Sequence, residues 1–148
     1  MRDIICVNNL YKLYRIGDSA VRALDGVSLS IREGEFCAIV GTSGSGKSTL
    51  LNMLAGLERP TRGEVIISGQ HIEKLKEDEL VRFRRENVGF IFQSFHLLGT
   101  LNALENVALP LTFRGEPRKI RLKKANRMLE LVSLEKHKMH MPNQMSGG

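Results

Sequence analysis

The alternation of apolar and polar positions predicts a β region at the start of the chain. Partial alternation over residues 4–14 and 21–31 is typical of strands with one covered face, and turns are expected at Ile16–Ser19 and Arg32–Glu35. A further short strand, with a turn on each side, is expected within residues 59–72. These segments together predict a series of β-strands joined by turns.

Two other apolar runs, Phe36–Val40 and Val88–Phe92, show no alternation. A strand that is apolar on both faces belongs in the middle of a parallel sheet covered by helices. The pattern therefore predicts both runs as buried strands of an α/β core.

The remaining pattern predicts helices. Residues 48–58 have apolar positions at helical spacing, and residues 76–85 begin with acids and end with bases, which suits the helix dipole. From Ser94 onward the period is helical, and the segments expected to be helical are residues 100–111, 117–134 and 134–141, with breaks at Pro110, Gly115 and Ser133. The last residues, PNQMSGG, are typical of the cap of a further helix.

Composition changes this picture little. The chain has 148 residues with 42% hydrophobic and 26% charged residues, ordinary values for one globular domain. Its apolar runs are far shorter than the roughly twenty residues needed to cross a bilayer, and its first residues do not form a secretion signal, so a cytoplasmic protein is expected. Cys6 and Cys37 are expected to be reduced core thiols, and His137 and His140 give only a weak signal for a metal.

The net charge of +6 is concentrated in residues 114–127, where bases greatly outnumber acids. Two interpretations are open: a solvated helix face, or a surface that meets an anion such as phospholipid headgroups or nucleic acid. The segment has no interleaved aromatic residues, which argues against nucleic acid.

The strongest chemical signal is GTSGSGKST, which lies between a predicted strand and a predicted helix. It fits the phosphate-loop pattern GxxxxGK[ST], in which glycines let successive backbone N–H groups point inward at the positive end of a helix. A nucleoside triphosphate is the expected ligand. The residues concerned are Gly41, Thr42, Ser43, Gly44, Ser45, Gly46, Lys47, Ser48 and Thr49.

Each polar residue of this loop has an expected role. Lys47 is expected to contact the β- and γ-phosphates, and the Ser48 hydroxyl to be one ligand of Mg²⁺. The Thr49 hydroxyl is expected next to the α-phosphate or as a helix cap. Outside the loop, Gln93 at a strand end could meet Mg²⁺ or the attacking water, and Tyr14 could stack on a purine ring, although each is also an ordinary residue at its position.

Residues 22–69, residues 84–111 and the terminal MSGG together resemble the nucleotide-binding subunit of ATP-binding-cassette transporters. The stretch RRENVGFIFQSFHLL followed by ALENVALPL is most similar to the cassettes of lipoprotein-releasing and macrolide-efflux transporters, a group that also resembles the cell-division cassette. Met145 in place of leucine and Asn102 in place of threonine are mild departures from that group.

The resemblance implies ATP and Mg²⁺ as cofactors. It implies that Tyr14 stacks on adenine, that Gln93 forms the glutamine loop, and that Ser146, Gly147 and Gly148 begin the signature that contacts the γ-phosphate held by the opposite subunit. It also implies a sandwich dimer, and a transmembrane permease subunit docked on residues 95–105. The expected location is then the inner face of the cell membrane, where the subunit would be peripheral.

The resemblance also implies an arrangement of subdomains within 1–148. Residues 1–35 and 61–75 would form an antiparallel β subdomain, residues 36–60 and 76–93 a phosphate-loop core, and residues 94–148 a helical subdomain.

The family pattern places an acidic pair and a switch histidine after Gly148. We therefore expect ATP binding without hydrolysis by these residues alone, and a core sheet that lacks its later strands. A part of a longer protein, a truncated gene, and completion by a second copy are all open explanations. The alternative function is a non-catalytic or regulatory module that docks on a membrane partner.

Overall fold

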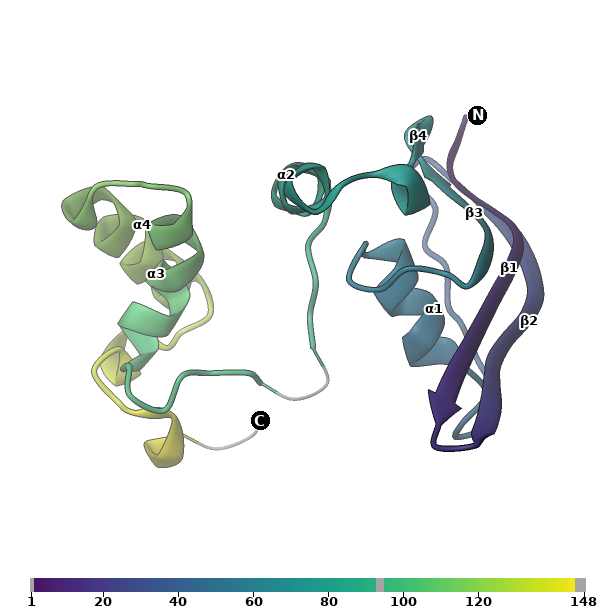
Figure 1. Cartoon of the computed structure of the whole chain (residues 1–148). Coiled ribbons are helices and arrows are strands. Elements are labelled where there is room, and N and C mark those ends of the chain that lie inside the picture. The colour runs from purple at the N-terminus through teal and green to yellow at the C-terminus, as the bar shows by residue number, and fades with distance from the viewer. Residues whose placement is uncertain (1, 93–94, 146–148) are drawn as a thin grey trace. The chain divides into compact units, whose positions relative to one another are not determined.

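In the computed structural model, which describes residues 2–92 and 95–145, the chain forms two units. The first ends at Ile91 and the second begins at Phe92 (Figure 1). The first unit contains an antiparallel sheet and two helices, and the second contains a pair of helices.

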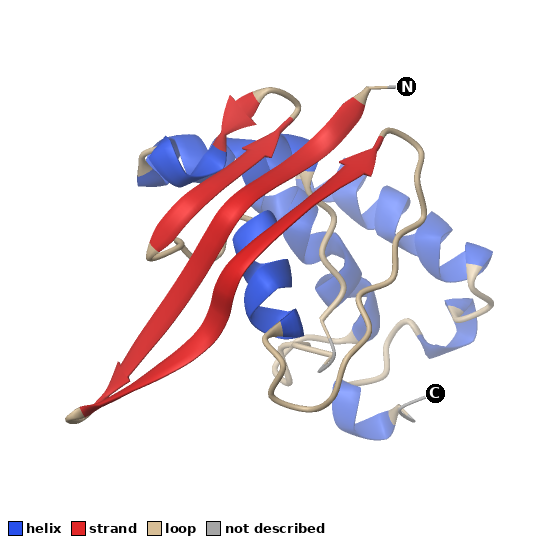
Figure 2. Cartoon of the chain, turned by 90° about the vertical axis from the view of Figure 1, so that its right-hand side faces the viewer, coloured by secondary structure: helices blue, strands red, loops and turns tan. Residues whose placement is uncertain are grey.

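The sheet is built around a long hairpin, as the sequence predicts. Strand β1 (Asp3–Ile16) pairs with β2 (Ser19–Arg32), and its other edge pairs with β3 (Arg62–Ile67), which turns into the short β4 (Gln70–His71). The order is β2-β1-β3-β4 and every pairing is antiparallel (Figure 2). The predicted strands and the turn between Ile16 and Ser19 are confirmed.

Register places one row of apolar side chains on the inner face of this sheet. Val7 lies opposite Leu29 on β2 and opposite Val65 on β3. Helix α1 (Lys47–Leu54) covers this face (Figures 1 and 2), and α2 (Glu77–Asn87) follows a 3-10 turn at Ile72–Lys74. Both helices were predicted. The buried core consists of Val7, Leu10, Leu24, Leu50, Met53, Val65, Ile67, Ile72, Leu75, Leu80 and Phe83.

The prediction of buried strands at Phe36–Val40 and Val88–Phe92 is wrong for this structure. Neither segment has regular secondary structure, and Phe36 and Ile91 are both 97% exposed. A strand needs a neighbour for its backbone N–H and C=O groups, and no described strand pairs with either segment. The prediction that Cys37 is a core thiol fails with it, because Cys37 is exposed, whereas Cys6 is half-buried; both are free.

The second unit consists of α3 (Ala103–Phe113) and α4 (Arg118–Leu131), which pack through Ala108, Ala125 and Leu129. Asn102 caps α3: its side chain accepts from the Glu105 N–H at 2.9 Å, and the Glu105 carboxylate accepts from the Asn102 N–H at 3.1 Å. This reciprocal box needs a short oxygen-bearing side chain at position 102, which explains why asparagine serves there.

Two predictions in this unit need correction. Helix α3 continues through Pro110 to Phe113, because packing on α4 outweighs the single N–H that the proline lacks. Residues 134–141 form only a 3-10 turn at Glu135–His137, followed by another at Pro142–Gln144. The breaks at Gly115 and Ser133 are confirmed, since both residues have positive φ angles.

No helix in the described residues is long and apolar enough to cross a membrane.

Candidate functional site: the loop before helix α1

The predicted phosphate loop has a conformation that only glycine can adopt at its end. Gly46 has φ +86°, and a Cβ built there would lie 2.2 Å from the Ala23 carbonyl oxygen of β2 and 2.9 Å from a Leu24 methyl. Gly44 also has a positive φ, +79°, but faces open space. The loop is therefore seated on β2 at Gly46, and its tip is free of steric contact at Gly44.

Helix α1 begins immediately after this seat, and its first amides face the loop. The earliest bond of the helix runs from the Leu50 N–H to the Gly46 carbonyl at 2.9 Å. The N–H groups of Lys47, Ser48 and Thr49 precede that bond and have no carbonyl partner within the helix. Gly46 offers no side chain to cap them. They form, with the helix dipole, a positive region suited to an anion.

Lys47 adds a full positive charge to the same region. Its ammonium group donates to the Gly41 carbonyl at 2.9 Å, to the Thr42 carbonyl at 2.6 Å and to the Ser45 hydroxyl at 3.2 Å. Within the described residues, no carboxylate forms an ion pair with Lys47. The loop thus holds an uncompensated cation with three oxygen acceptors, a position that phosphate oxygens can take over.

Tyr14 comes from β1 and contacts Glu58, which lies in the segment after α1. Its hydroxyl donates to the Glu58 carboxylate at 2.8 Å, and Lys12 pairs with the same carboxylate at 2.9 Å. Burial and the Glu58 bond raise the pKa of Tyr14, while a bond to the Thr49 side chain opposes them. The structure therefore brings Tyr14 and Thr49, two of the predicted site residues, together.

Glu58 and Lys12 are site-supporting residues that the sequence pattern did not indicate. Burial would raise the pKa of Glu58, but the hydrogen bonds from Lys12 and Tyr14 outweigh it and lower the pKa. Lys12 also donates to the Arg59 carbonyl at 2.8 Å, so it joins β1 to the segment after α1. These contacts span more than forty residues, and no local spacing could have shown them.

The other predicted site residues cannot be placed in this way. Gln93 lies outside the described residues, and so do Ser146, Gly147 and Gly148.

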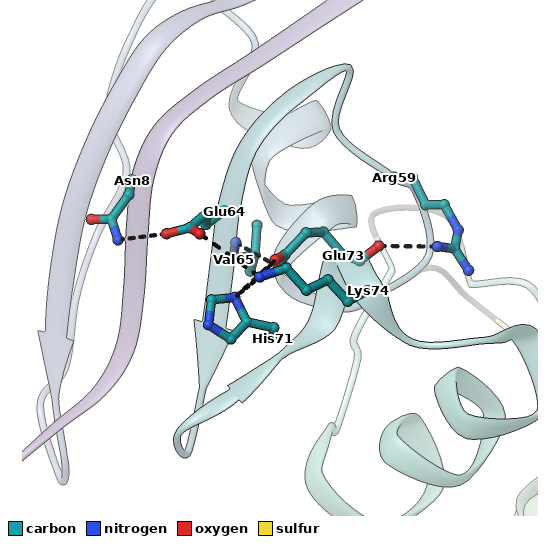
Figure 3. Close-up of polar contacts among 7 residues, drawn as sticks. All are labelled: Asn8, Arg59, Glu64, Val65, His71, Glu73 and Lys74. Carbon is teal, nitrogen blue, oxygen red and sulfur yellow. Dashed lines mark hydrogen bonds and ion pairs between the residues drawn. The ribbon is translucent and has the colours of Figure 1, made fainter.

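The structure shows one further polar cluster, at the β3–β4 turn (Figure 3). The imidazole Nδ1 of His71 lies 2.9 Å from the Glu73 carboxylate, which also accepts from the Val65 N–H at 3.0 Å, and Glu64 lies close by. Burial would raise the pKa of Glu73, but the backbone bonds from Val65 and from its own N–H, with the His71 contact, lower it.

The cluster contains side chains of the types that bind metal ions, namely Glu64, His71 and Glu73. The positively charged side chain of Lys74, however, lies among them. The Lys74 ammonium is 3.4 Å from His71 Nδ1, 3.8 Å from Glu73 and 3.9 Å from Glu64. The Arg59 guanidinium also donates to the Glu73 backbone carbonyl at 3.0 Å. The cluster therefore fixes the turn after β3 by ion pairs and hydrogen bonds.

Comparison with known proteins places the loop in a family context. The family model described as "ABC transporter" matches residues 24–148. The chain is 47% identical over 145 residues to the macrolide export ATP-binding/permease protein MacB of Chlorobaculum tepidum, covering 98% of this chain and 22% of that protein. It is 46% identical over 139 residues to the lipoprotein-releasing system ATP-binding protein LolD of Chromohalobacter salexigens, covering 94% of this chain and 59% of that protein.

A solved structure agrees with these relatives. The dimeric, post-hydrolysis state of the ATP-binding cassette MJ0796, bound to ADP and Pi, superimposes with a TM-score of 0.88 at 44% identity. The match covers 97% of this chain and 63% of that one. The expected α/β cassette fold with an antiparallel sheet and a helical part is thereby confirmed.

Proposed function

Because the chain belongs to the ABC transporter family, we propose that it binds MgATP at Gly41–Thr49 and acts as the ATP-binding subunit of a transporter of the lipoprotein-releasing or macrolide-efflux type. The observation that carries the proposal is the Lys47 ammonium in a glycine loop at the start of α1, which bonds to loop oxygens and forms no ion pair with a carboxylate of the described residues. An ammonium, free helix amides and a glycine seat are together what a triphosphate tail requires.

Different residues of the loop bind different parts of MgATP. Lys47 exchanges its bonds to the Gly41 and Thr42 carbonyls for bonds to phosphate oxygens, and the amides of α1 donate to the same group. The Ser48 hydroxyl, which is exposed at the start of α1, would hold Mg²⁺ together with Gln93. When bound, Mg²⁺ neutralises phosphate charge and fixes the geometry of the triphosphate.

The base of the nucleotide is assigned to Tyr14. Its hydroxyl is held by Glu58 at 2.8 Å and also contacts the Thr49 side chain, so its ring has a fixed position beside the predicted loop. A ring held in this way stacks on adenine at a small cost in side-chain entropy.

The names of the relatives support a proposal of two macromolecular partners. A second copy would supply Ser146, Gly147 and Gly148 to the γ-phosphate, as in a sandwich dimer; the MJ0796 cassette was solved as a dimer. A membrane-embedded permease would dock on residues 95–105, where Phe95 is 70% exposed and Leu97 and Leu98 are each 48% exposed. Exposed apolar side chains in sequence are typical of such a contact.

Titration calorimetry with MgATP tests the nucleotide site. The wild-type chain is expected to release heat and to melt at a higher temperature with nucleotide, and Lys47→Ala to weaken binding by roughly 100-fold, through loss of about 3 kcal/mol of charge-assisted bonds. Lys136→Ala, which removes an exposed lysine from the second unit, is the matched control and should bind as wild type. Absence of heat and of thermal protection with folded wild-type protein would contradict the proposal.

The second candidate is a docking module that does not need nucleotide, and the exposed apolar side chains at Phe95, Leu97 and Leu98 favour it. Capture of a membrane partner by Lys47→Ala, with capture lost in Phe95→Ser/Leu98→Ser, would support this alternative. Capture that requires both MgATP and Lys47 would favour the ATP-driven subunit.

A further inference from the structure

The charge of the chain is concentrated on one helix of the second unit. Residues 113–131 contain seven bases and two acids, a balance of +5 in a chain whose total is +6. The seven bases are Arg114, Arg118, Lys119, Arg121, Lys123, Lys124 and Arg127. Most of them lie on α4.

Helix α4 presents one face to α3 and the opposite face outward. Ala125 and Leu129 are 1% and 4% exposed and define the inner face. At 3.6 residues per turn the opposite side is formed by Ile120, Lys123, Arg127 and Leu131. We call these four residues, with Lys119, Lys124 and the acid Glu130 beside them, the outer face of α4.

The outer face combines unpaired bases with exposed apolar side chains. Lys124 is paired with Glu116 at 2.8 Å, and Glu130 bonds to Asn126. Among the described residues, no carboxylate pairs with Lys119, Lys123 or Arg127. Ile120 is 48% exposed and Leu131 is 69% exposed on the same side.

A solvated helix face explains the bases but gives no role to Ile120 and Leu131. Nucleic acid is favoured by bases together with aromatic side chains, and the outer face has none. Bases around isolated apolar side chains match the boundary of an anionic bilayer, where phosphates pair with Lys and Arg while the apolar groups enter the headgroup region.

We propose that the outer face of α4 binds directly to anionic phospholipid, as a contact with the membrane surface separate from any permease. The bases supply attraction to lipid phosphate, and Ile120 and Leu131 supply the apolar part of the contact. The proposal involves no nucleotide chemistry, so it stands or fails independently of the ATP site.

Vesicle co-sedimentation of the full chain tests it. Vesicles of phosphatidylcholine alone are compared with vesicles in which phosphatidylglycerol makes up about one third of the lipid. Wild type is expected to bind the anionic vesicles at least about tenfold more tightly, with affinity falling as salt rises. Lys119→Gln/Lys123→Gln/Arg127→Gln should lose at least about tenfold in affinity for the anionic vesicles.

The matched control removes the same charge from the first unit. Lys76→Gln/Arg82→Gln/Arg85→Gln changes three exposed bases on or beside α2, and should keep vesicle affinity within about twofold of wild type. Ile120→Ser/Leu131→Ser should weaken binding without changing its salt dependence. Unchanged melting temperature and unchanged MgATP response show that each variant is folded, and Lys47→Ala should bind vesicles as wild type does.

Three outcomes would overturn the proposal. The first is no preference of wild-type protein for anionic vesicles. The second is an equal loss in the α4 and α2 triple variants, which would show that net charge alone is responsible. The third is tighter binding to duplex DNA than to vesicles, with the same dependence on Lys119, Lys123 and Arg127, which would assign the face to nucleic acid.

Discussion

The backbone of β1 is paired in the sheet and that of the segment Phe36–Val40 is not, although the segment is the more apolar of the two. Strand β1 mixes apolar and polar residues, yet it is paired on both edges and its Leu10 is fully buried. Phe36–Val40 is wholly apolar, yet it has no strand partner among the described residues, and Val40 is 91% exposed. Backbone pairing therefore decides where a strand forms, and apolar character alone does not.

The surroundings of the phosphate loop can therefore be divided into two parts. The anchored side is Gly46 with helix α1, and the open side is the exposed apolar segments that have no regular secondary structure. On the anchored side, Gly46 rests on β2 and α1 packs into the core through Leu50 and Met53. On the open side, which consists of Phe36–Val40 and Val88–Phe92, the residues that pack partly against that core are Ile39 and Val88. Changes on the anchored side should alter stability and binding far more than changes on the open side.

The largest effect is expected at Gly46. Gly46→Ala places a methyl 2.2 Å from the Ala23 carbonyl at a φ of +86°, so β2 or the loop must move. We expect a loss of about 4 kcal/mol in unfolding free energy, and loss of MgATP binding. Gly44→Ala, also at positive φ but in open space, is the control and should cost only about 1 kcal/mol. Equal losses in urea denaturation would show that Gly46 is not a steric anchor.

Leu10 and Phe36 test the comparison directly. Leu10→Ala removes a side chain with no exposure from the sheet core and should cost about 3 kcal/mol. Phe36→Ala removes a larger side chain that is 97% exposed, and should change the unfolding free energy by less than about 0.5 kcal/mol. A large loss at Phe36 would mean that the open side is packed in solution.

A smaller effect is expected where Glu58 joins β1 to the segment after α1. Glu58→Gln removes the carboxylate that Lys12 and Tyr14 share, at a cost of about 1 kcal/mol near neutral pH. Because the pKa of Glu58 is lowered on folding, its contribution is present above the ordinary value of 4.5 and is lost as the pH falls through the folded-state pKa.

The measurement is the unfolding free energy of wild type and Glu58→Gln as a function of pH at acid pH. Wild type should lose stability more steeply than Glu58→Gln as the pH falls below 4.5. Because a neutral amide oxygen is a weaker acceptor for the Tyr14 hydroxyl than the Glu58 carboxylate, the variant should also bind ATP more weakly, while its binding of inorganic triphosphate stays unchanged. Identical pH curves would show that Glu58 is not stabilised by folding.

The sequence predicted the elements that local signals specify. The hairpin follows from alternation around a Gly17–Asp18 turn, and α1 follows from its apolar spacing after a glycine loop. Phe36–Val40 was predicted wrongly because its pattern reports only apolarity, whereas a strand depends on a neighbour elsewhere in the chain. The Tyr14–Glu58–Lys12 contacts were missed for the same reason, since distant residues meet only after folding.

The smallest effect on stability is expected from making the open side polar. Phe36→Ser/Ile91→Ser replaces two side chains that are each 97% exposed, so the unfolding free energy should change by less than about 0.5 kcal/mol. Exposed apolar segments outside a sheet can associate with another chain, so self-association of the wild type should weaken in this variant. Sedimentation velocity over a range of concentrations measures this self-association.

Leu131→Ser, which removes an exposed apolar side chain from the second unit, is the control. If Leu131→Ser reduced association as strongly as the double variant, general surface apolarity, and not the exposed segments of the open side, would be its cause.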